Sequence, residues 1–555
     1  MLGRRPWGMR LLALVTALVI LVSACGSPTP SPSGPASASG AASPSATRDE
    51  LVVGLSAETE SMDPYLVYQN AGNTIMYAIF DPLLTIDPEG NLGPGLAKEW
   101  KVVDDTTIDL TLNDGIRFHD DEPLDASAVR FSIYRMIDFD PATDAKIADK
   151  SKLLNSGIAG DYLAIQKVDV VDPLHVRIHL SRPDAALPTA LGRLFIVPPK
   201  YIGRVGNAEF GRKPVGTGPY VFREWVKDDH TTVDRNAAYW DSPRGRPLVG
   251  TVRFRPLADA ATRVNELTTG GVDILQDPSI DQKRTIEAAG GSIVSRNDDP
   301  HHIEIWLTTD KGAFGAGGQV PSASERQALE ALAKRDVRIA LNMAVDRQAI
   351  IETLYAKTAE PMTHAFVKGD LGYDPAIQPY PYDPDRAKEM LAAAGYAKGF
   401  EVTLDFCTCD RLDPIEAVAA DLAKIGVKVT VNQLEISQFN QGWGKGTNPM
   451  RSSRLGFTDP STFLRLWLQT PSDRGGFLSR YSNPQMDKLI DQQSVTYDHD
   501  QRVAILHQIG ALSHDDPPAI FLFHSPNLYA TNASVKGWQP HFIGYIPVLG
   551  VSLGG

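Results

Sequence analysis

The sequence is poor in cysteine, in positive charge and in recognisable catalytic motifs. Its 555 residues include only three cysteines, Cys25, Cys407 and Cys409. An exported protein that is stabilised mainly by disulfide bonds would contain many more. The zinc-peptidase motif HExxH, the nucleophile elbow G-x-S-x-G and the phosphate loop G-x-x-x-x-G-K-S/T are absent. A formal net charge of −13 argues against nucleic acid or anionic lipid as a bound partner, because both need a basic face. We therefore expect no enzyme, no cofactor and no nucleic-acid partner.

The apolar run near the N-terminus is too short to span a membrane, which takes roughly 20 residues. It covers residues 11–22, follows three arginines and is typical of an export signal. It ends in Val-Ser-Ala-Cys at residues 22–25, which resembles a bacterial lipobox, where the thiol is diacylated and the chain is cut before the cysteine. We predict a signal peptide at residues 1–24 and a lipid anchor on Cys25, because two or three acyl chains hold a protein on a membrane. In the alternative, the signal is an ordinary one and its cysteine is incidental.

The segment after this cysteine has nothing to bury. Residues 26–47 consist only of Gly, Ser, Pro, Thr and Ala, so we predict a disordered tether that runs to residue 49. The rest of the chain is long enough for two or three domains, and an apolar content of 43% is normal for globular cores. The combination of a lipid anchor, a flexible linker and an acidic globular body predicts a capture protein on the extracytoplasmic face of the cell membrane.

Local patterns predict several elements of this body. We expect a strand over residues 51–55, a helix with one apolar face over 73–84, and a helix that opens at Asp125. Further on, a strand over 400–406, a helix over 413–426 and a strand over 427–434 form a βαβ crossover.

The βαβ crossover makes its two strands parallel, and ligands of such sheets bind beyond the carboxyl ends of the strands. Residues 407–411 would then lie at a cleft edge; in the alternative they form a plain loop. For Cys407-Thr408-Cys409, three interpretations stay open: a strained disulfide, a contact to a soft metal or haem, and two ordinary thiols. A metal would need further ligands, for which the candidates are His301, His302 and His364.

Five blocks of sequence occur in an order that is typical of one protein family. The first, over residues 94–136, reads PGLAKEW…DDTTIDLTLNDGIRFHDDEPLDASAVRFSIYRM. The others contain GTGPY with RNAAYW, VRIALNMAVDR, YDPDRAKEMLAAAGY and YSNPQMDKL, at residues 216–240, 337–347, 382–396 and 481–489. Together they resemble family 5 extracellular solute-binding proteins, the dipeptide, oligopeptide and nickel receptors of ABC importers.

The resemblance implies an α/β, two-lobed periplasmic-binding-protein type II fold with a hinge and a subdomain inserted in the first lobe. We expect lobe I over residues 50–88, 198–298 and 527–555, the insert over 89–197, and lobe II over 299–526. The chain would cross between the lobes near residues 302–308 and 527–531, and a few residues at each crossing would absorb the closing motion.

The implied function is capture of a peptide or peptide-like solute by a monomer that delivers it to the membrane subunits of an ABC permease. The other function that the family admits is a receptor for a metal chelate, haem or another small molecule, or a solute sensor.

Residues 451–464 are the most informative about the ligand. They resemble the segment in which peptide-binding members carry an aspartate, a few residues after a tryptophan, that pairs with the α-ammonium of the peptide. Here Phe457 takes the place of the tryptophan, and only Thr458 separates it from Asp459. Because a buried ammonium needs an anionic partner, Asp459 is the nearest candidate for that role. In the alternative, Asp459 starts a turn before Pro460, which weakens the assignment to dipeptides.

Other candidates surround this segment. Arg451 and Arg454 are either anion-binding groups or solvated charges beside a strand, and aromatic residues such as Trp306 either stack on a ligand or belong to the core. Since neighbouring side chains of a strand face opposite ways, at most one of His301 and His302 faces a cleft. The predicted ligand-binding set is Asp459, Phe457, Thr458, Arg454, Arg451, Trp443, Tyr65 and His302.

Overall fold

The computed structural model describes residues 48–67, 69–154, 156–240, 242–296, 301–309, 322–408, 410–442, 449–471 and 479–554. The predicted signal peptide, Cys25, the linker, Cys409 and Trp443 lie outside these residues. The segment Thr47–Gly555 forms one compact unit. In the described part of the chain, no helix is long and apolar enough to cross a membrane.

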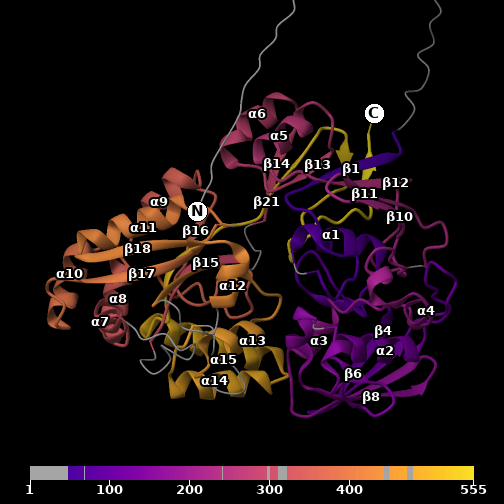
Figure 1. Cartoon of the computed structure of the whole chain (residues 1–555), viewed down its shortest axis with the longest axis horizontal. Coiled ribbons are helices and arrows are strands. Elements are labelled where there is room, and N and C mark those ends of the chain that lie inside the picture. Colours follow the sequence, from indigo (N-terminus) through magenta and orange to yellow (C-terminus); the bar gives the residue numbers. More distant parts are fainter. Residues whose placement is uncertain are drawn as a thin grey trace, which may run out of the picture. The chain divides into compact units, whose positions relative to one another are not determined.

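Seven strands form the sheet of lobe I (Figure 1), in the order β10-β11-β12-β1-β13-β21-β14. The strands are β1 (Glu50–Leu55), β10 (Tyr220–Val226), β11 (His230–Arg235), β12 (Thr251–Pro256), β13 (Ile274–Gln276), β14 (Ser292–Ser295) and β21 (Leu528–Thr531). The helices are α1 (Asn70–Ile79), α4 (Pro199–Phe210), α5 (Ala260–Thr268) and α6 (Lys283–Ala288).

Strand β1 is buried on both faces, as expected for a strand between the parallel neighbours β12 and β13. Leu51 and Val53 belong to one core with α1, whereas Val52 belongs to a second core with α5 and α6. The strand predicted at residues 51–55 is thereby confirmed. The helix predicted over 73–84 ends earlier, because the residue before Pro82 is disfavoured in a helix.

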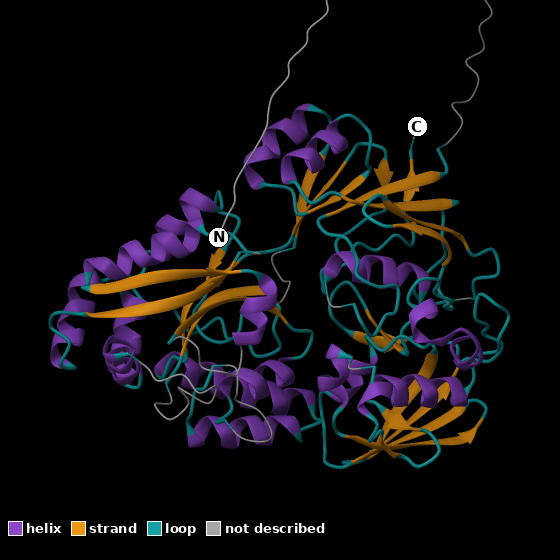
Figure 2. Cartoon of the chain, in the orientation of Figure 1, coloured by secondary structure: helices purple, strands orange, loops and turns teal. Residues whose placement is uncertain are grey.

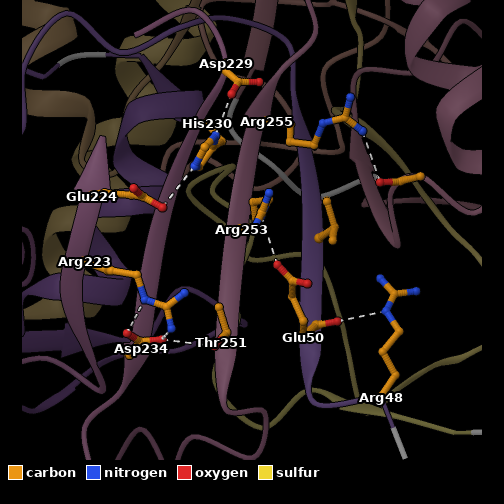
Figure 3. A network of polar contacts seen from close by, with 12 residues as sticks. Arg48, Glu50, Arg223, Glu224, Asp229, His230, Asp234, Thr251, Arg253 and Arg255 are labelled. Atoms are coloured by element: carbon orange, nitrogen blue, oxygen red, sulfur yellow. Dashed lines mark hydrogen bonds and ion pairs between the residues drawn. The ribbon is translucent and has the colours of Figure 1, made fainter. Parts of the chain in front are cut away.

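Charged side chains line the strands β10, β11, β12 and β1 of this sheet (Figure 3). Arg223 Nε lies 2.6 Å from Asp234 Oδ2, and Arg253 Nε lies 3.0 Å from Glu50 Oε1. These side chains are 38–47% exposed, and pairs as exposed as this contribute little stability. The fold of lobe I therefore rests on its two cores.

The insert is built on an antiparallel four-stranded sheet of order β4-β5-β9-β8. Its elements are β4 (Ala97–Asp104), β5 (Thr107–Leu112), α2 (Ala126–Met136), β8 (Ile165–Asp172), β9 (His175–Leu180) and α3 (Leu187–Leu191). Helix α2 begins where the sequence predicted, because the Asp125 carboxylate accepts hydrogen bonds from the amides of Ser127 and Ala128.

Lobe II contains a six-stranded sheet of order β16-β20-β15-β19-β17-β18. The strands are β15 (His301–Leu307), β16 (Glu360–Pro361), β17 (Phe400–Cys407), β18 (Val427–Leu434), β19 (Met450–Gly456) and β20 (Ala519–His524). The helices are α7 (Ala323–Leu332), α8 (Arg335–Met343), α9 (Arg347–Leu354), α10 (Pro384–Ala393), α11 (Asp413–Lys424), α12 (Ile436–Gly442), α13 (Pro460–Phe463), the π-helical turn η4 (Leu464–Leu468), α14 (Pro484–Ser494) and α15 (His499–Asp515).

Helices cover both faces of the sheet of lobe II (Figure 2). Along β15, Ile305 and Leu307 belong to a core with α7 to α11, whereas Trp306 belongs to a core with α13 to α15. The predicted βαβ crossover is confirmed, since β17 and β18 pair in parallel on either side of α11.

The shorter elements complete the chain. They are β2 (Leu84–Ile86), β3 (Leu92–Pro94), β6 (Phe139–Asp140), β7 (Ala145–Lys146), η1 (Lys150–Lys152), η2 (Gly157–Tyr162), η3 (Ile280–Gln282), β22 (Val535–Lys536) and β23 (Ser552–Leu553).

The apolar cores separate the two lobes. One core draws on lobe I and the insert, whereas two others draw only on lobe II, so no apolar cluster of the described residues joins the lobes. The chain passes from one sheet to the other between β14, which ends at Ser295, and β15, which begins at His301, and again between β20, which ends at His524, and β21, which begins at Leu528. Both passages lie next to the ranges predicted for the crossings, 302–308 and 527–531, because strands β15 and β21 occupy almost all of those ranges.

The strands of each of the three larger sheets come from one of the three predicted parts of the chain, whereas β2, in the predicted lobe I, pairs with β3, in the predicted insert. The exact division of the unit into 50–88, 89–197, 198–298, 299–526 and 527–555 stays a prediction.

Two glycines of the GTGPY block lie directly against the end of α1. A Cβ atom at Gly216 would lie 2.1 Å from Ile79 O, and one at Gly218 would lie 2.5 Å from Ile79 C. The backbone of this block therefore approaches α1 at a distance that only glycine permits.

Candidate functional site

The insert and lobe II meet through a row of polar contacts. Arg193 Nη1 donates to Thr458 Oγ1 at 3.1 Å, and Arg465 Nη2 donates to the carbonyl oxygen of Gly160 at 2.9 Å. The Thr462 hydroxyl donates to the Asp161 carboxylate. Polar contacts of this kind can be broken and reformed, so they suit two parts that move relative to each other.

Two adjoining cavities lie along this row and share Asp161 and Arg193. The first, here called the aromatic cavity, has about 480 Å³ of empty space and is lined by lobe I and the insert. The second, here called the polar cavity, has about 450 Å³ and is lined by the insert and lobe II. The aromatic cavity includes Tyr77, Tyr162, Phe195 and Tyr545, and the polar cavity includes Asp184, Phe457, Thr458, Asp459, Ser461, Thr462 and Arg465. Both volumes include open solvent, so the two cavities are crevices that are partly open to solvent.

Three predicted site residues, Phe457, Thr458 and Asp459, line the polar cavity. The ring of Phe457 packs 5.6 Å from that of Phe463 and 5.6 Å from that of Trp467, which anchors it on the core of lobe II. Thr458 accepts the hydrogen bond from Arg193 of the insert. The short segment after β19 therefore forms the lobe II wall of this cavity.

Asp459 is held by Arg502 in a buried ion pair. Its carboxylate oxygens accept from Arg502 at 2.6 and 2.8 Å, and the two side chains are 12% and 7% exposed. Asp459 also caps α13 by accepting from the amide of Ser461 at 2.9 Å. Burial raises the pKa of Asp459, but the charge of Arg502 more than reverses this and holds that pKa below its usual value. These contacts favour the interpretation of Asp459 as a turn residue over the interpretation as an ammonium partner.

The two predicted anion-binding arginines lie elsewhere. Arg451 is buried, with Nη1 3.5 Å from Asp405 Oδ2 and the guanidinium 4.0 Å from the ring centroid of Phe439. Burial, opposed by the charge of Asp405, lowers the pKa of Arg451 to about 10. Arg454 is exposed and places Nη2 3.5 Å from Asn527 Oδ1, at the crossing between β20 and β21. Neither arginine lines the two cavities.

Tyr65 and His302 lie inside cores. The Tyr65 hydroxyl donates to the carbonyl oxygen of Phe195 at 2.7 Å, and its ring is fully buried. His302 Nδ1 lies 2.7 Å from Glu304 Oε2, beneath the ring of Phe463. A ligand role for either residue would require the side chain to leave these contacts. Trp443 lies outside the described residues, and the ligand roles of the whole predicted set stay predictions.

The structure tests part of the predictions for Cys407 and for a metal site. Cys407 is disulfide-bonded, which excludes a free thiol at that position, and Cys409 lies outside the described residues. His364 is buried, and burial lowers its pKa to about 4. In the described ranges, no three His, Cys, Asp or Glu side chains converge in a way that could hold a metal ion.

The sequence reasoning missed Arg193, Asp161 and Arg465. A signal was present for Arg193, which is the one charged residue in the otherwise apolar and small-residue run over residues 185–199. No local pattern marked the other two.

Comparisons with known proteins identify the family. The family model described as bacterial extracellular solute-binding proteins, family 5 (middle), matches residues 91–475. The chain belongs to this family. The predicted resemblance is confirmed, and so is the expectation that the chain is not an enzyme, because this is a family of binding proteins.

Relatives within family 5 differ in what they bind. The chain is 28% identical over 477 residues to the glutathione-binding protein GsiB of Escherichia coli O1:K1, covering 81% of this chain and 84% of GsiB. DppA from Helicobacter pylori, solved with the peptide STSA, has a TM-score of 0.75 at 24% identity and covers 92% of this chain and 99% of DppA. NikA from Staphylococcus aureus, solved with Ni(L-His)2, has a TM-score of 0.71 at 19% identity and covers 91% of this chain and 100% of NikA. Both structures confirm the predicted two-lobed type II fold.

Proposed function

We propose that this protein is the substrate-binding component of an ABC importer, anchored outside the cytoplasm by lipid on Cys25. It captures a peptide or peptide-like solute as a monomer and delivers it to the permease. The observation that carries this proposal is the pair of adjoining cavities, whose walls come from lobe I, the insert and lobe II. A solute that fills both cavities touches both lobes at once.

The separate cores supply the mechanism. Lobe I shares a core with the insert, and lobe II has two cores of its own, so closure leaves these cores intact and changes mainly the polar contacts along the cavities. The two passages between the sheets, from β14 to β15 and from β20 to β21, are where a hinge between the lobes would bend. A solute that binds the closed form stabilises it by its own binding free energy.

The ligand class follows from the relatives and the cavities together. GsiB supports a small peptide such as glutathione as the first candidate. One observation favours the alternative of a non-peptide solute, such as a metal chelate or haem: Arg502 already occupies the carboxylate of Asp459, the expected ammonium partner. The two candidates differ in what the purified protein carries.

The test is to denature the purified protein and identify the released solute by mass spectrometry, with absorbance spectra for nickel or haem. Thermal unfolding and small-angle scattering then follow with that solute, or with reduced glutathione if nothing is released. A hundredfold excess over the dissociation constant should add about 2.7 kcal/mol to the free energy of unfolding, and the radius of gyration should fall. Tight binding with an unchanged radius would contradict the closing mechanism.

A further inference from the structure

Arg193 stands out among the arginines that border the cavities. It lines both of them, and its only side-chain hydrogen bond within the described ranges is the one to Thr458 Oγ1. Among the same residues, no carboxylate lies within ion-pairing distance of its guanidinium. A half-buried positive charge thus has a single neutral hydroxyl as its partner.

Two other arginines of the described residues, Arg502 and Arg244, are paired with carboxylates. Arg502 is bound by both oxygens of Asp459, and Arg244 Nη1 lies 2.7 Å from Asp81 Oδ1 and also bonds to backbone carbonyls. A guanidinium has five N–H donors in a planar fork that matches a carboxylate. Arg193 therefore retains the donors for one bidentate anion, and these donors border space that a solute can fill.

The backbone at Arg193 is fixed before any solute arrives. Its amide donates to the carbonyl oxygen of Ala190 at 2.9 Å, and the next carbonyl, of Leu194, accepts from the amide of Leu83 at 2.8 Å. The preceding residue is tightly packed, because a Cβ at Gly192 would lie 2.8 Å from Ile86 Cγ1 and would force that side chain to shift. Because this backbone is already ordered in the empty protein, ordering it adds little to the free-energy cost of binding a solute.

We propose that Arg193 is a specificity-determining residue that binds a carboxylate of the captured solute. This assignment rests on the proposed function and defines the solute class as small peptides or amino-acid derivatives with a free carboxylate. Asp161 lines the same two cavities and is placed to receive a cationic group of the same solute. Since Arg193 belongs to the insert and Thr458 to lobe II, a carboxylate bound between them contacts both sides of the closing motion.

The experiment compares probes that differ only in their carboxylates. The full chain is titrated calorimetrically with reduced glutathione and with its diethyl ester, and with dialanine and its amide. We expect the free acids to bind about 10- to 100-fold more tightly than the blocked forms, the usual strength of a charged hydrogen bond. Arg193→Gln should bind the free acids about 10- to 100-fold more weakly than the wild type does. This variant should bind the free acids and the blocked forms with equal affinity.

Two further variants control for charge and fold. Arg193→Lys keeps the charge but not the fork, so it should retain part of the preference for acids. Arg212→Gln removes an exposed arginine that lines neither cavity, so this variant should bind every probe as the wild type does. Thermal unfolding of the empty proteins checks that all variants fold; if Arg193→Gln does not, the lysine variant and the wild-type probe pairs still decide.

Three results would overturn the assignment: equal binding of acids and blocked forms by the wild type, unchanged binding of acids by Arg193→Gln, or no binding of any probe. The first two results would not contradict the receptor function, provided that the protein still closes on some solute. The receptor function fails separately if the purified protein releases no solute and no compound changes its radius of gyration.

Discussion

Replacing Asp459 by asparagine tests whether this residue binds the ammonium group of a peptide or instead stabilises lobe II through its ion pair with Arg502. If Asp459 pairs with a peptide ammonium, the substitution abolishes peptide binding and leaves the empty protein as stable as before. If the Arg502 pair is the true role, the substitution destabilises lobe II and leaves affinity nearly unchanged. The structure supports the second outcome, because both carboxylate oxygens are bonded to Arg502.

The expected loss of stability follows from burial. Removing one member of a buried ion pair costs about 3–5 kcal/mol, because the remaining charge is left unpaired out of water. Asparagine keeps one oxygen for the cap of α13 and for Arg502, so we expect a value near the lower limit, about 3 kcal/mol. At roughly 2–4 °C per kcal/mol for a domain of this size, the Tm of lobe II should fall by about 6–12 °C.

Differential scanning calorimetry and peptide titration together decide the outcome. Asp498→Asn is the matched control, since Asp498 caps α15 by accepting from the amide of Gln501 at 2.9 Å but is exposed. Asparagine caps helices as well as aspartate does, so this variant should melt like the wild type. An Asp459→Asn protein that melts within about 1 °C of the wild type, yet binds no peptide, would refute the reasoning.

The pH dependence gives a second test of the pair. Burial raises the pKa of Asp459, but the charge of Arg502 lowers it by more, so the folded-state pKa lies below the ordinary value near 3.9. A lowered pKa stabilises the fold above that ordinary value, and the contribution is lost as the pH falls through the folded-state pKa. The Tm difference between wild type and Asp459→Asn should be constant from pH 5 to 8 and should narrow below about pH 4.

Three further predictions concern other parts of the chain. Gly218→Ala should destabilise lobe I by about 1–3 kcal/mol or more and lower its Tm, because the added Cβ would lie 2.5 Å from the backbone of α1. The control Gly203→Ala adds a Cβ where no atom lies within 4 Å, so this variant should melt no lower than the wild type. Equal melting of the two variants would contradict the close approach of Gly218 to α1. Burial lowers the pKa of His302 but its buried carboxylate partner raises it above 6.5, so the pair should stabilise lobe II below pH 6.5 and lose that effect as the pH rises through the folded-state pKa. A Tm profile of His302→Gln with the same slope as the wild type would refute this, with the exposed His499→Gln as control. Cys25→Ser should leave a folded but soluble or uncleaved protein in cell fractionation, and an equally membrane-bound, processed variant would disprove the lipid anchor.

Much of the fold could be predicted because its determinants lie close together in the sequence. The N-cap at Asp125 bonds to amides two and three residues away, and α2 begins as expected. The crossover of β17, α11 and β18 was predictable from its period and its turns, because right-handed βαβ connections leave one arrangement. The ordered blocks of residues 91–489 also identified the family, which the family model confirms for residues 91–475.

The tertiary structure alone decided what the charged residues of the site do. Asp459 and Arg502 are 43 positions apart and meet only because α15 packs against α13, which turned an apparent ligand group into half of an ion pair. Arg193 and Thr458 are 265 positions apart, in different parts of the fold. A sequence pattern reports on neighbours within a few turns of chain, whereas the partner of a buried charge depends on which distant elements pack together. For that reason the sequence by itself determined the family, the elements and the segment that borders the site. The packing determined which charged groups are already paired and which, such as Arg193, face the cavities without an ion-pair partner among the described residues.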